Sequence, residues 1–305
     1  MTAQAARRLQ QIERILRALV CLLTIAACSP APSPPREPIS PSRPARSPAP
    51  SASVPTAPVG PQGPEPAPTS TTPEPPATIE LEVPGFLPAT VIVPARSSRP
   101  APLVVTLHGA GGRPEPHCDR YKEITQGRAF VLCTRGTPNN KHLPEEQRGY
   151  FYDGHHRLGQ EVLAAMDALV ARFQGEVDAS RAVFAGYSQG ASMGLLFLHE
   201  KAEHTARFGR ALFVEGGFAD WNIALSGRMT RSGLDRVALV CGQVKCKSDA
   251  ERSLGYMKRG GLEARLSFDG RGGHTYGGAV APLVVSAFEW LVQDDPRFGA
   301  ASASR

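Results

Sequence analysis

The chain has 305 residues, 34 of them Lys or Arg and 28 of them Asp or Glu, which gives a formal net charge of +6 at pH 7. Half of this excess lies in residues 1–27, where four Arg face one Glu, so the rest of the chain is near +3. No basic cluster is interleaved with aromatic residues, which argues against nucleic acid as a partner.

Residues 1–27 are typical of a secretory signal. A basic start precedes the apolar run 18–27, which is shorter than the roughly 20 apolar residues that a membrane span needs. The run ends in Ile25-Ala26-Ala27-Cys28, which resembles the lipobox of bacterial lipoproteins. The resemblance implies cleavage before Cys28, acylation of this cysteine and attachment to a membrane, the outer one where the source has it. The alternative is an ordinary signal followed by a chance cysteine.

Residues 28–78 are predicted to be a tether rather than a domain. Positions 29–78 hold 18 of the 29 prolines, mixed with Ala, Ser and Thr, and such a stretch cannot bury enough apolar surface to fold. In an extended polyproline-like form at about 3.1 Å per residue it reaches on the order of 100 Å from its anchor. We expect one catalytic domain at 79–296, which is long enough for a substantial hydrophobic core, and a disordered tail at 297–305.

Short apolar runs alternate with amphipathic patterns along the predicted domain. The runs 79–83 and 90–93 predict a leading antiparallel pair of strands. Further strands are predicted at 103–107, 130–133, 181–185, 210–214, 237–241 and 264–268, and helices at 158–173, 189–200, 249–259 and 281–293. This alternation indicates an α/β fold with a mostly parallel sheet and helices on both faces.

Four cysteines lie in the predicted domain. In an exported protein they indicate two disulfides, and pairing Cys118 with Cys133 and Cys241 with Cys246 closes two short loops, although sequence alone leaves the connectivity open. The rival interpretation is a zinc site, but no cysteine–histidine cluster has ligand spacing. We therefore expect no metal.

The pentapeptide Gly186-Tyr187-Ser188-Gln189-Gly190 follows the strand 181–185 and precedes the helix 189–200. A G-x-S-x-G sequence in this context forms a strained strand-to-helix turn that exposes the serine as a nucleophile. A serine hydroxyl is a weak nucleophile by itself, so the motif is informative only with a base and an oxyanion site.

Two glycine-rich loops supply candidates for both. His108-Gly109-Ala110-Gly111-Gly112 follows the strand 103–107, and Gly272-Gly273-His274-Thr275-Tyr276 follows the last strand. With the serine motif, they make the chain resemble the α/β-hydrolase family over residues 79–293. The resemblance implies His274 as the base, His108 as a support, and an oxyanion hole formed by the N–H of Gln189 with that of Ala110 or Gly111.

The carboxylate that completes the triad is left open by the sequence. Asp249 is narrowly preferred because the family acid usually follows the strand that here ends at Cys241, but it lies farther on than usual and could be only a helix cap. Glu215, at the end of the strand 210–214, is the runner-up, since a carboxylate at the end of a buried strand needs a partner. Asp269 is a third candidate.

Within the family, the exported context and the HGAGG loop resemble the polyhydroxybutyrate-depolymerase and feruloyl-esterase-like esterases. The resemblance implies an exported serine esterase of the cell envelope, without cofactor, that acts on a small or oligomeric ester. Aromatic residues near the predicted cleft can hold an acyl group or serve only as packing: Tyr150, Phe151, Tyr152, Phe218 and Trp221. The alternatives are a serine peptidase of the same fold and a non-catalytic envelope-binding protein.

Overall fold

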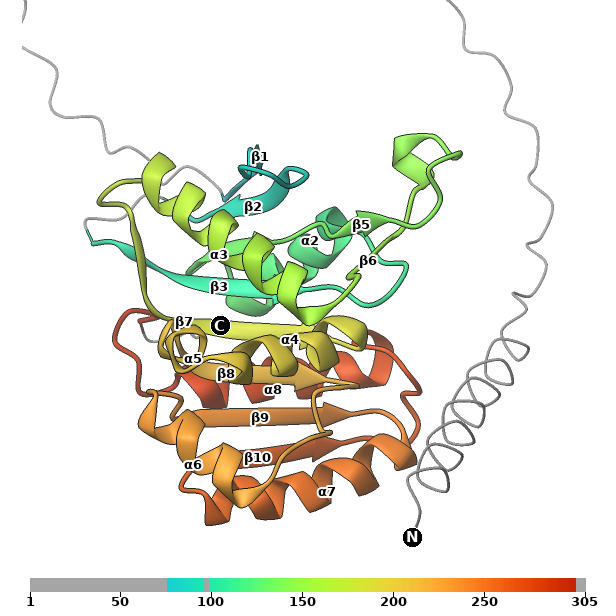
Figure 1. The fold of residues 1–305 in the computed structure, drawn as a ribbon, viewed down its shortest axis with the longest axis vertical. Helices are drawn as coiled ribbons and strands as arrows, with labels where there is room; N and C mark the ends of the chain where they lie inside the picture. The colour runs from blue at the N-terminus through green and yellow to red at the C-terminus, as the bar shows by residue number, and fades with distance from the viewer. Residues whose placement is uncertain (1–75, 96–98, 300–305) are drawn as a thin grey trace, which may run out of the picture. The chain divides into compact units, whose positions relative to one another are not determined.

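The computed structural model describes residues 76–95 and 99–299. An eight-stranded sheet runs through this part in the order β1-β2-β4-β3-β7-β8-β9-β10 (Figure 1). β1 and β2 form an antiparallel pair, β2 is antiparallel to β4, and all remaining pairs are parallel. The strands are β1 (Ala77–Leu81), β2 (Ala89–Val93), β3 (Ala101–Leu107), β4 (Phe130–Cys133), β7 (Val177–Tyr187), β8 (Phe208–Val214), β9 (Arg236–Cys241) and β10 (Glu263–Phe268).

Helices cover both faces of the sheet, as the sequence predicted. One buried cluster joins the sheet to α3, α4, α6 and α7, and the other joins it to α2 and α8. Along β7, Phe184 belongs to the first cluster while Val183 and Ala185 belong to the second, because successive strand side chains point to opposite faces. The helices are α2 (Pro114–Thr125), α3 (His155–Arg172), α4 (Gln189–Glu200), α5 (Ala202–Ala206), α6 (Ile223–Arg231), α7 (Val244–Arg259) and α8 (Ala281–Val292).

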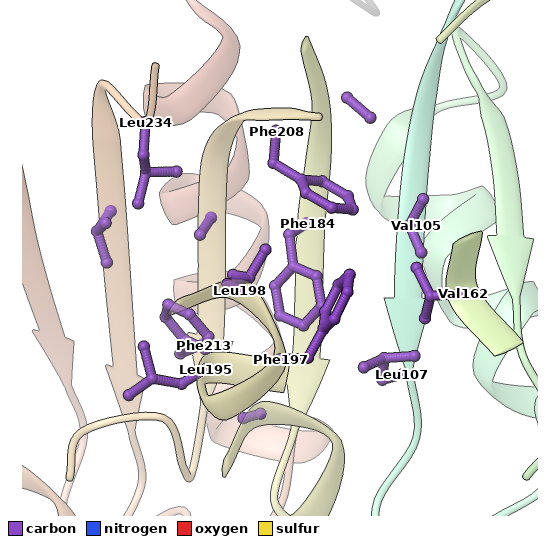
Figure 2. Packing of buried hydrophobic residues seen from close by; sticks show 14 of the residues in the cluster. Val105, Leu107, Val162, Phe184, Leu195, Phe197, Leu198, Phe208, Phe213 and Leu234 are labelled. Carbon is purple, nitrogen blue, oxygen red and sulfur yellow. The ribbon is translucent and has the colours of Figure 1, made fainter. Parts of the chain in front are cut away.

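Aromatic side chains fill the first cluster between β7, β8 and α4 (Figure 2). The ring of Phe184 lies 5.8 Å from that of Phe208 and 5.6 Å from that of Phe213. α4 approaches the sheet closely because it presents Gly194 there, where a Cβ would lie 2.1 Å from the Phe184 ring. This packing fixes α4, and with it the turn from which the helix begins.

The structure shifts several predicted boundaries. β1 begins at Ala77, two residues inside the predicted tether, and α7 begins at Val244 rather than at 249. Disorder is predicted for 297–305, but this is wrong for the first of these residues, because Phe298 is 2% exposed and packs on Phe288.

Both disulfides join the expected partners, Cys118 with Cys133 and Cys241 with Cys246. Short elements occupy the loops: a hairpin of β5 (Thr137–Pro138) and β6 (Tyr150–Phe151), and 3₁₀ turns η1 (Glu145–Gln147) and η2 (Gly278–Val280).

Among the helices of residues 76–95 and 99–299, none is both long enough and apolar enough to cross a membrane. The predicted signal, the lipidation site at Cys28 and most of the predicted tether lie outside these residues.

Candidate active site

Ser188 lies in the turn between β7 and α4, and its backbone is in a conformation that non-glycine residues rarely adopt. Its φ is 52° and its ψ is −113°. Two close backbone approaches surround it: a Cβ on Gly190 would lie 2.4 Å from the Leu107 carbonyl oxygen, and one on Gly186 would lie 2.7 Å from the Ala191 backbone. The glycines of the G-x-S-x-G motif are therefore needed for the chain to turn this sharply.

Ser188, His274 and Glu215 form a continuous hydrogen-bonded chain. The serine Oγ lies 2.7 Å from Nε2 of His274, and Nδ1 of the same ring lies 3.1 Å from a carboxylate oxygen of Glu215. The His274 side chain is 45% exposed whereas that of Glu215 is 1% exposed. The order is that of a hydroxyl nucleophile, a base and a buried acid.

Glu215 is held from three sides at the carboxyl end of β8. Its backbone N–H donates to the Val240 carbonyl oxygen at 2.9 Å, and its second carboxylate oxygen accepts the N–H of Gly242. Its φ is 54°, so the backbone turns sharply out of the strand here. A buried carboxylate is costly unless it is paired, and Gly242 and His274 supply the partners.

The preference for Asp249 is corrected by the structure, which places Glu215 and not Asp249 against His274. Asp249 lies inside α7 and pairs with Lys245 at 3.1 Å and Arg252 at 3.6 Å. Asp269 also faces away from the triad, since hydrogen bonds from Arg271 hold it and lower its pKa to about 2.

The HGAGG loop lies against the serine turn. A Cβ on Gly109 would be 3.3 Å from the Ser188 Cβ, and the Gly190 N–H donates to the His108 carbonyl oxygen at 3.1 Å. Of the two loop donors predicted for the oxyanion hole, Gly111 has its N–H engaged by the Tyr150 carbonyl oxygen at 2.8 Å. Within residues 99–299, the N–H groups of Ala110 and Gln189 make no hydrogen bond, so they are the pair available to an oxyanion.

His108 supports this loop rather than facing the serine. It is 2% exposed, and its Nδ1 and Nε2 lie 2.8 Å and 2.9 Å from the carbonyl oxygens of Gly109 and Arg135. Burial lowers the pKa of His108. Its ring also stacks on Tyr152 at a centroid separation of 4.9 Å.

Two further groups position the site, and neither follows a sequence pattern. The Tyr187 hydroxyl donates to the His274 carbonyl oxygen at 2.8 Å and so ties the histidine loop to the serine turn. Gly242 holds the same loop through its carbonyl oxygen, which accepts the Gly273 N–H at 2.9 Å, while its own N–H holds Glu215. Tyr187 occupies a position that the motif leaves unspecified, and Gly242 acts only through its backbone.

Neither a protein-family model nor a curated protein sequence matches the chain. Solved structures do resemble it. A protein of Klebsiella pneumoniae assigned to the dienelactone hydrolases aligns over 72% of this chain and 100% of its own, with 12% identity and a TM-score of 0.53. The fluorophosphonate-binding serine hydrolase F of Staphylococcus aureus, with substrate bound, aligns over the same shares with 14% identity and a TM-score of 0.51.

The chain has the α/β-hydrolase fold. An acylaminoacyl peptidase of Pyrococcus horikoshii aligns over 73% of the chain with 12% identity and a TM-score of 0.48, and this chain spans 41% of that longer protein.

Within this fold, the predicted aromatic residues divide into two groups. Tyr150, Tyr152 and Trp221 are buried and serve as packing, whereas Phe151 and Phe218 are partly exposed. A surface hollow of about 470 Å³ lies at the opposite end of the strands, near the start of β3, and contains none of the triad. Ser188 is partly exposed, as is the side chain of His274.

Proposed function

We propose that this α/β-hydrolase is an exported serine esterase, which cleaves carboxylic esters through an acyl-enzyme. The observation that carries the proposal is the hydrogen-bonded chain from the Ser188 hydroxyl through both ring nitrogens of His274 to the buried carboxylate of Glu215. A serine with an oriented base and two unused backbone N–H groups beside it is the arrangement that acyl transfer requires.

Proton movement follows from the distances. As the Ser188 oxygen attacks the ester carbonyl carbon, its proton passes over 2.7 Å to Nε2 of His274. Nδ1 of His274 then carries its own proton facing Glu215, and the carboxylate stabilises the imidazolium and holds this tautomer. His274 next gives the proton to the departing alcohol oxygen, which leaves an ester of Ser188.

The negative oxygen of the tetrahedral intermediate needs donors that are already in place. The N–H groups of Ala110 and Gln189 fill this role, each worth about 3 kcal/mol in related sites. The Gln189 side chain is itself fixed, because its amide oxygen accepts the Tyr152 N–H at 3.0 Å. In the second half of the reaction His274 takes a proton from water, whose oxygen attacks the acyl carbon. The bond from this carbon to the Ser188 oxygen then breaks, and His274 returns the proton to the serine.

Substrate and location rest on different evidence. The partial exposure of Ser188 and His274 is compatible with an oligomeric as well as a small ester. Export is supported by the two disulfides, which persist in oxidising compartments, and by the signal-like residues 1–27. Lipid attachment at Cys28 and residence at the cell envelope complete the proposal.

The test compares hydrolysis of short-chain aryl esters by wild type, Ser188→Ala, Glu215→Gln and Asp249→Asn. Loss of the nucleophile lowers kcat by about 10⁴-fold or more, and loss of the buried carboxylate lowers it by up to about 10⁴-fold. Asp249→Asn is the matched control, because among the described residues its carboxylate pairs with Lys245 and Arg252 and not with the triad, and we expect its kcat to stay within about twofold of wild type.

Three outcomes contradict the proposal. Equal activity of Glu215→Gln and wild type would show that Glu215 is not the acid of a catalytic triad. Faster turnover of peptide anilides than of aryl esters favours a peptidase. A folded wild type that is not labelled by a fluorophosphonate at Ser188 has no activated serine, and a binding role then replaces the enzymatic one.

A further inference from the structure

Three side chains of the types that bind metal ions lie close together where α3 begins and α4 ends. His155 and His156 occupy the first turn of α3, and Glu200 is the last residue of α4. One ligand atom from each lies within 4.8 Å of the others. Nδ1 of His156 is 2.8 Å from a Glu200 carboxylate oxygen, and the two imidazole rings lie 4.0 Å apart.

The two helices that carry these residues are held firmly together. Gly159 of α3 packs on Phe197 of α4 so closely that a Cβ would lie 2.6 Å from the ring. Beyond the end of α4, the Thr205 hydroxyl donates to the Leu198 carbonyl oxygen at 2.6 Å. The backbone positions of the cluster are therefore set by core packing, while the His156 side chain is 71% exposed and free to turn toward a ligand.

The two helix ends contribute opposite partial charges at this point. The end of α4 is partially negative and favours a cation, whereas the start of α3 is partially positive, so the side chains and not the helix ends supply the attraction. The Glu200 carboxylate adds a negatively charged group, and its side chain is 22% exposed.

A third histidine lies next to the cluster. His199 precedes Glu200 in α4. Its Nε2 is buried and has no hydrogen-bond partner within the described part of the chain. Buried polar atoms without a partner are uncommon and call for a specific explanation.

We propose that His155, His156 and Glu200 form a binding site for a divalent transition metal. Two imidazoles and one carboxylate suit Zn²⁺, Ni²⁺ or Cu²⁺ rather than Ca²⁺ or Mg²⁺, which take oxygen ligands. The ion would link the start of α3 to the end of α4, and water would fill its remaining positions. The site is independent of the esterase proposal, because it contains none of the triad.

The experiment titrates the untagged full-length chain with Zn²⁺ by calorimetry and with Co²⁺ by visible absorption. We expect one ion per chain, a d–d absorption band and a rise in Tm with Zn²⁺. His156→Ala and Glu200→Gln are expected to weaken binding by more than the roughly 10–100-fold that loss of a mere outer partner costs.

His142→Ala is the matched control, because this exposed histidine lies in the loop before η1, away from the cluster. It is expected to bind as wild type does. The proposal is overturned if wild type binds no Zn²⁺ at about 100 μM, or if affinity is unchanged in His156→Ala; the cluster is then an ordinary His–Glu ion pair. Because the His156 side chain is mostly exposed, its removal leaves the fold in place, which circular dichroism checks.

Discussion

At the scale of single residues, two members of the proposed triad have strained backbone conformations, and they follow adjacent strands of the sheet. Ser188 has a φ of 52° and Glu215 a φ of 54°, and each directly follows the end of one of two adjacent parallel strands. Such conformations cost about 1–3 kcal/mol each. The fold tolerates them because β7, β8 and α4 are fixed by the aromatic cluster around Phe184.

Replacing Ser188 with glycine is expected to stabilise the protein while it abolishes activity. Glycine reaches this φ and ψ without a Cβ clash, and after its larger unfolded-state entropy is subtracted we expect a gain of about 1 kcal/mol in the free energy of unfolding. Urea denaturation with the disulfides intact measures it. Ser188→Ala keeps the Cβ and serves as control; equal stability of the Gly and Ala variants would show that the turn is not strained.

Three of the predicted site segments are encoded locally in the sequence. The serine turn, the histidine loop and the HGAGG loop are short motifs whose glycines leave a recognisable spacing, and the structure brings them together. The acid is different, because Glu215 and His274 are 59 positions apart and no periodic signal in the sequence reports their contact. Asp249 was favoured by position after β9, but the early start of α7 at Val244 turns it into a helix-surface residue.

At the scale of elements, the turn from β9 into α7 supports the triad through its backbone. The disulfide Cys241–Cys246 closes this turn around Gly242, whose N–H and carbonyl oxygen hold Glu215 and the His274 loop. A Cβ at Gly242 would lie 2.3 Å from the Gly273 carbonyl oxygen, so no side chain fits at this position. The Cys118–Cys133 bond instead joins α2 to β4.

The Cys118–Cys133 bond is therefore expected to contribute more to stability, and the Cys241–Cys246 bond more to catalysis. Loop-closure entropy gives about 2 kcal/mol for the Cys241–Cys246 loop and about 3 kcal/mol for the longer Cys118–Cys133 loop. Replacing Cys241 and Cys246 with serine should lower kcat about tenfold or more because Glu215 loses its fixed position.

Replacing Cys118 and Cys133 should cost more stability but leave kcat nearly unchanged. Ester hydrolysis and urea denaturation of the two double variants separate these effects. An unchanged kcat in the Cys241, Cys246 variant would show that Gly242 keeps its place without the bond.

Element prediction was most accurate for strands and for the helix after Ser188, because buried parallel strands are short and β-branched. The missed helices carry weaker signals. α6 is only 9 residues long and contains Gly, Ser and Thr; its one clear mark is Asn222, whose side chain accepts the Leu225 N–H as an N-cap. α2 begins at a proline and buries the polar His117, which masks its apolar face.

At the scale of the whole molecule, the C-terminal segment is fastened to the starts of the central strands. Asp295 pairs with Arg210 of β8 and with Arg297 at 2.7 Å, and Arg297 reaches Asp178 of β7 at 3.4 Å. Burial alone would raise the pKa of Asp295, but hydrogen bonds and charge from Arg297, with the charge of Arg210, lower it. Phe298 then packs against Phe288.

Asp295→Asn is expected to lower the free energy of unfolding by about 1–3 kcal/mol, between the values for exposed and buried ion pairs. Because the folded pKa is depressed, this contribution is present above the ordinary aspartate pKa of about 4 and is lost as the pH falls through the folded value. Urea denaturation at pH 7 and pH 3 should show the gap between variant and wild type shrinking at pH 3.

Asp294→Asn is the neighbouring control, because Asp294 is exposed and pairs only with Arg236 in the described part of the chain. It should cost less than about 1 kcal/mol. A gap for Asp295→Asn that is as large at pH 3 as at pH 7 would mean that hydrogen bonding, and not charge, holds the segment.

The position of the acid directly after β8 also determines which segments of this protein can change during evolution without loss of the catalytic residues. Ser188 and Glu215 directly follow two neighbouring parallel strands, so the stretch from α7 to β10 contributes no side chain to the proposed triad. Selection on catalysis constrains that stretch through Cys246, whose disulfide closes the turn at Gly242, and through the return of the chain to His274. Insertions or grafted loops within it are therefore a route by which descendants, natural or engineered, can acquire new substrate recognition while the catalytic residues stay in place.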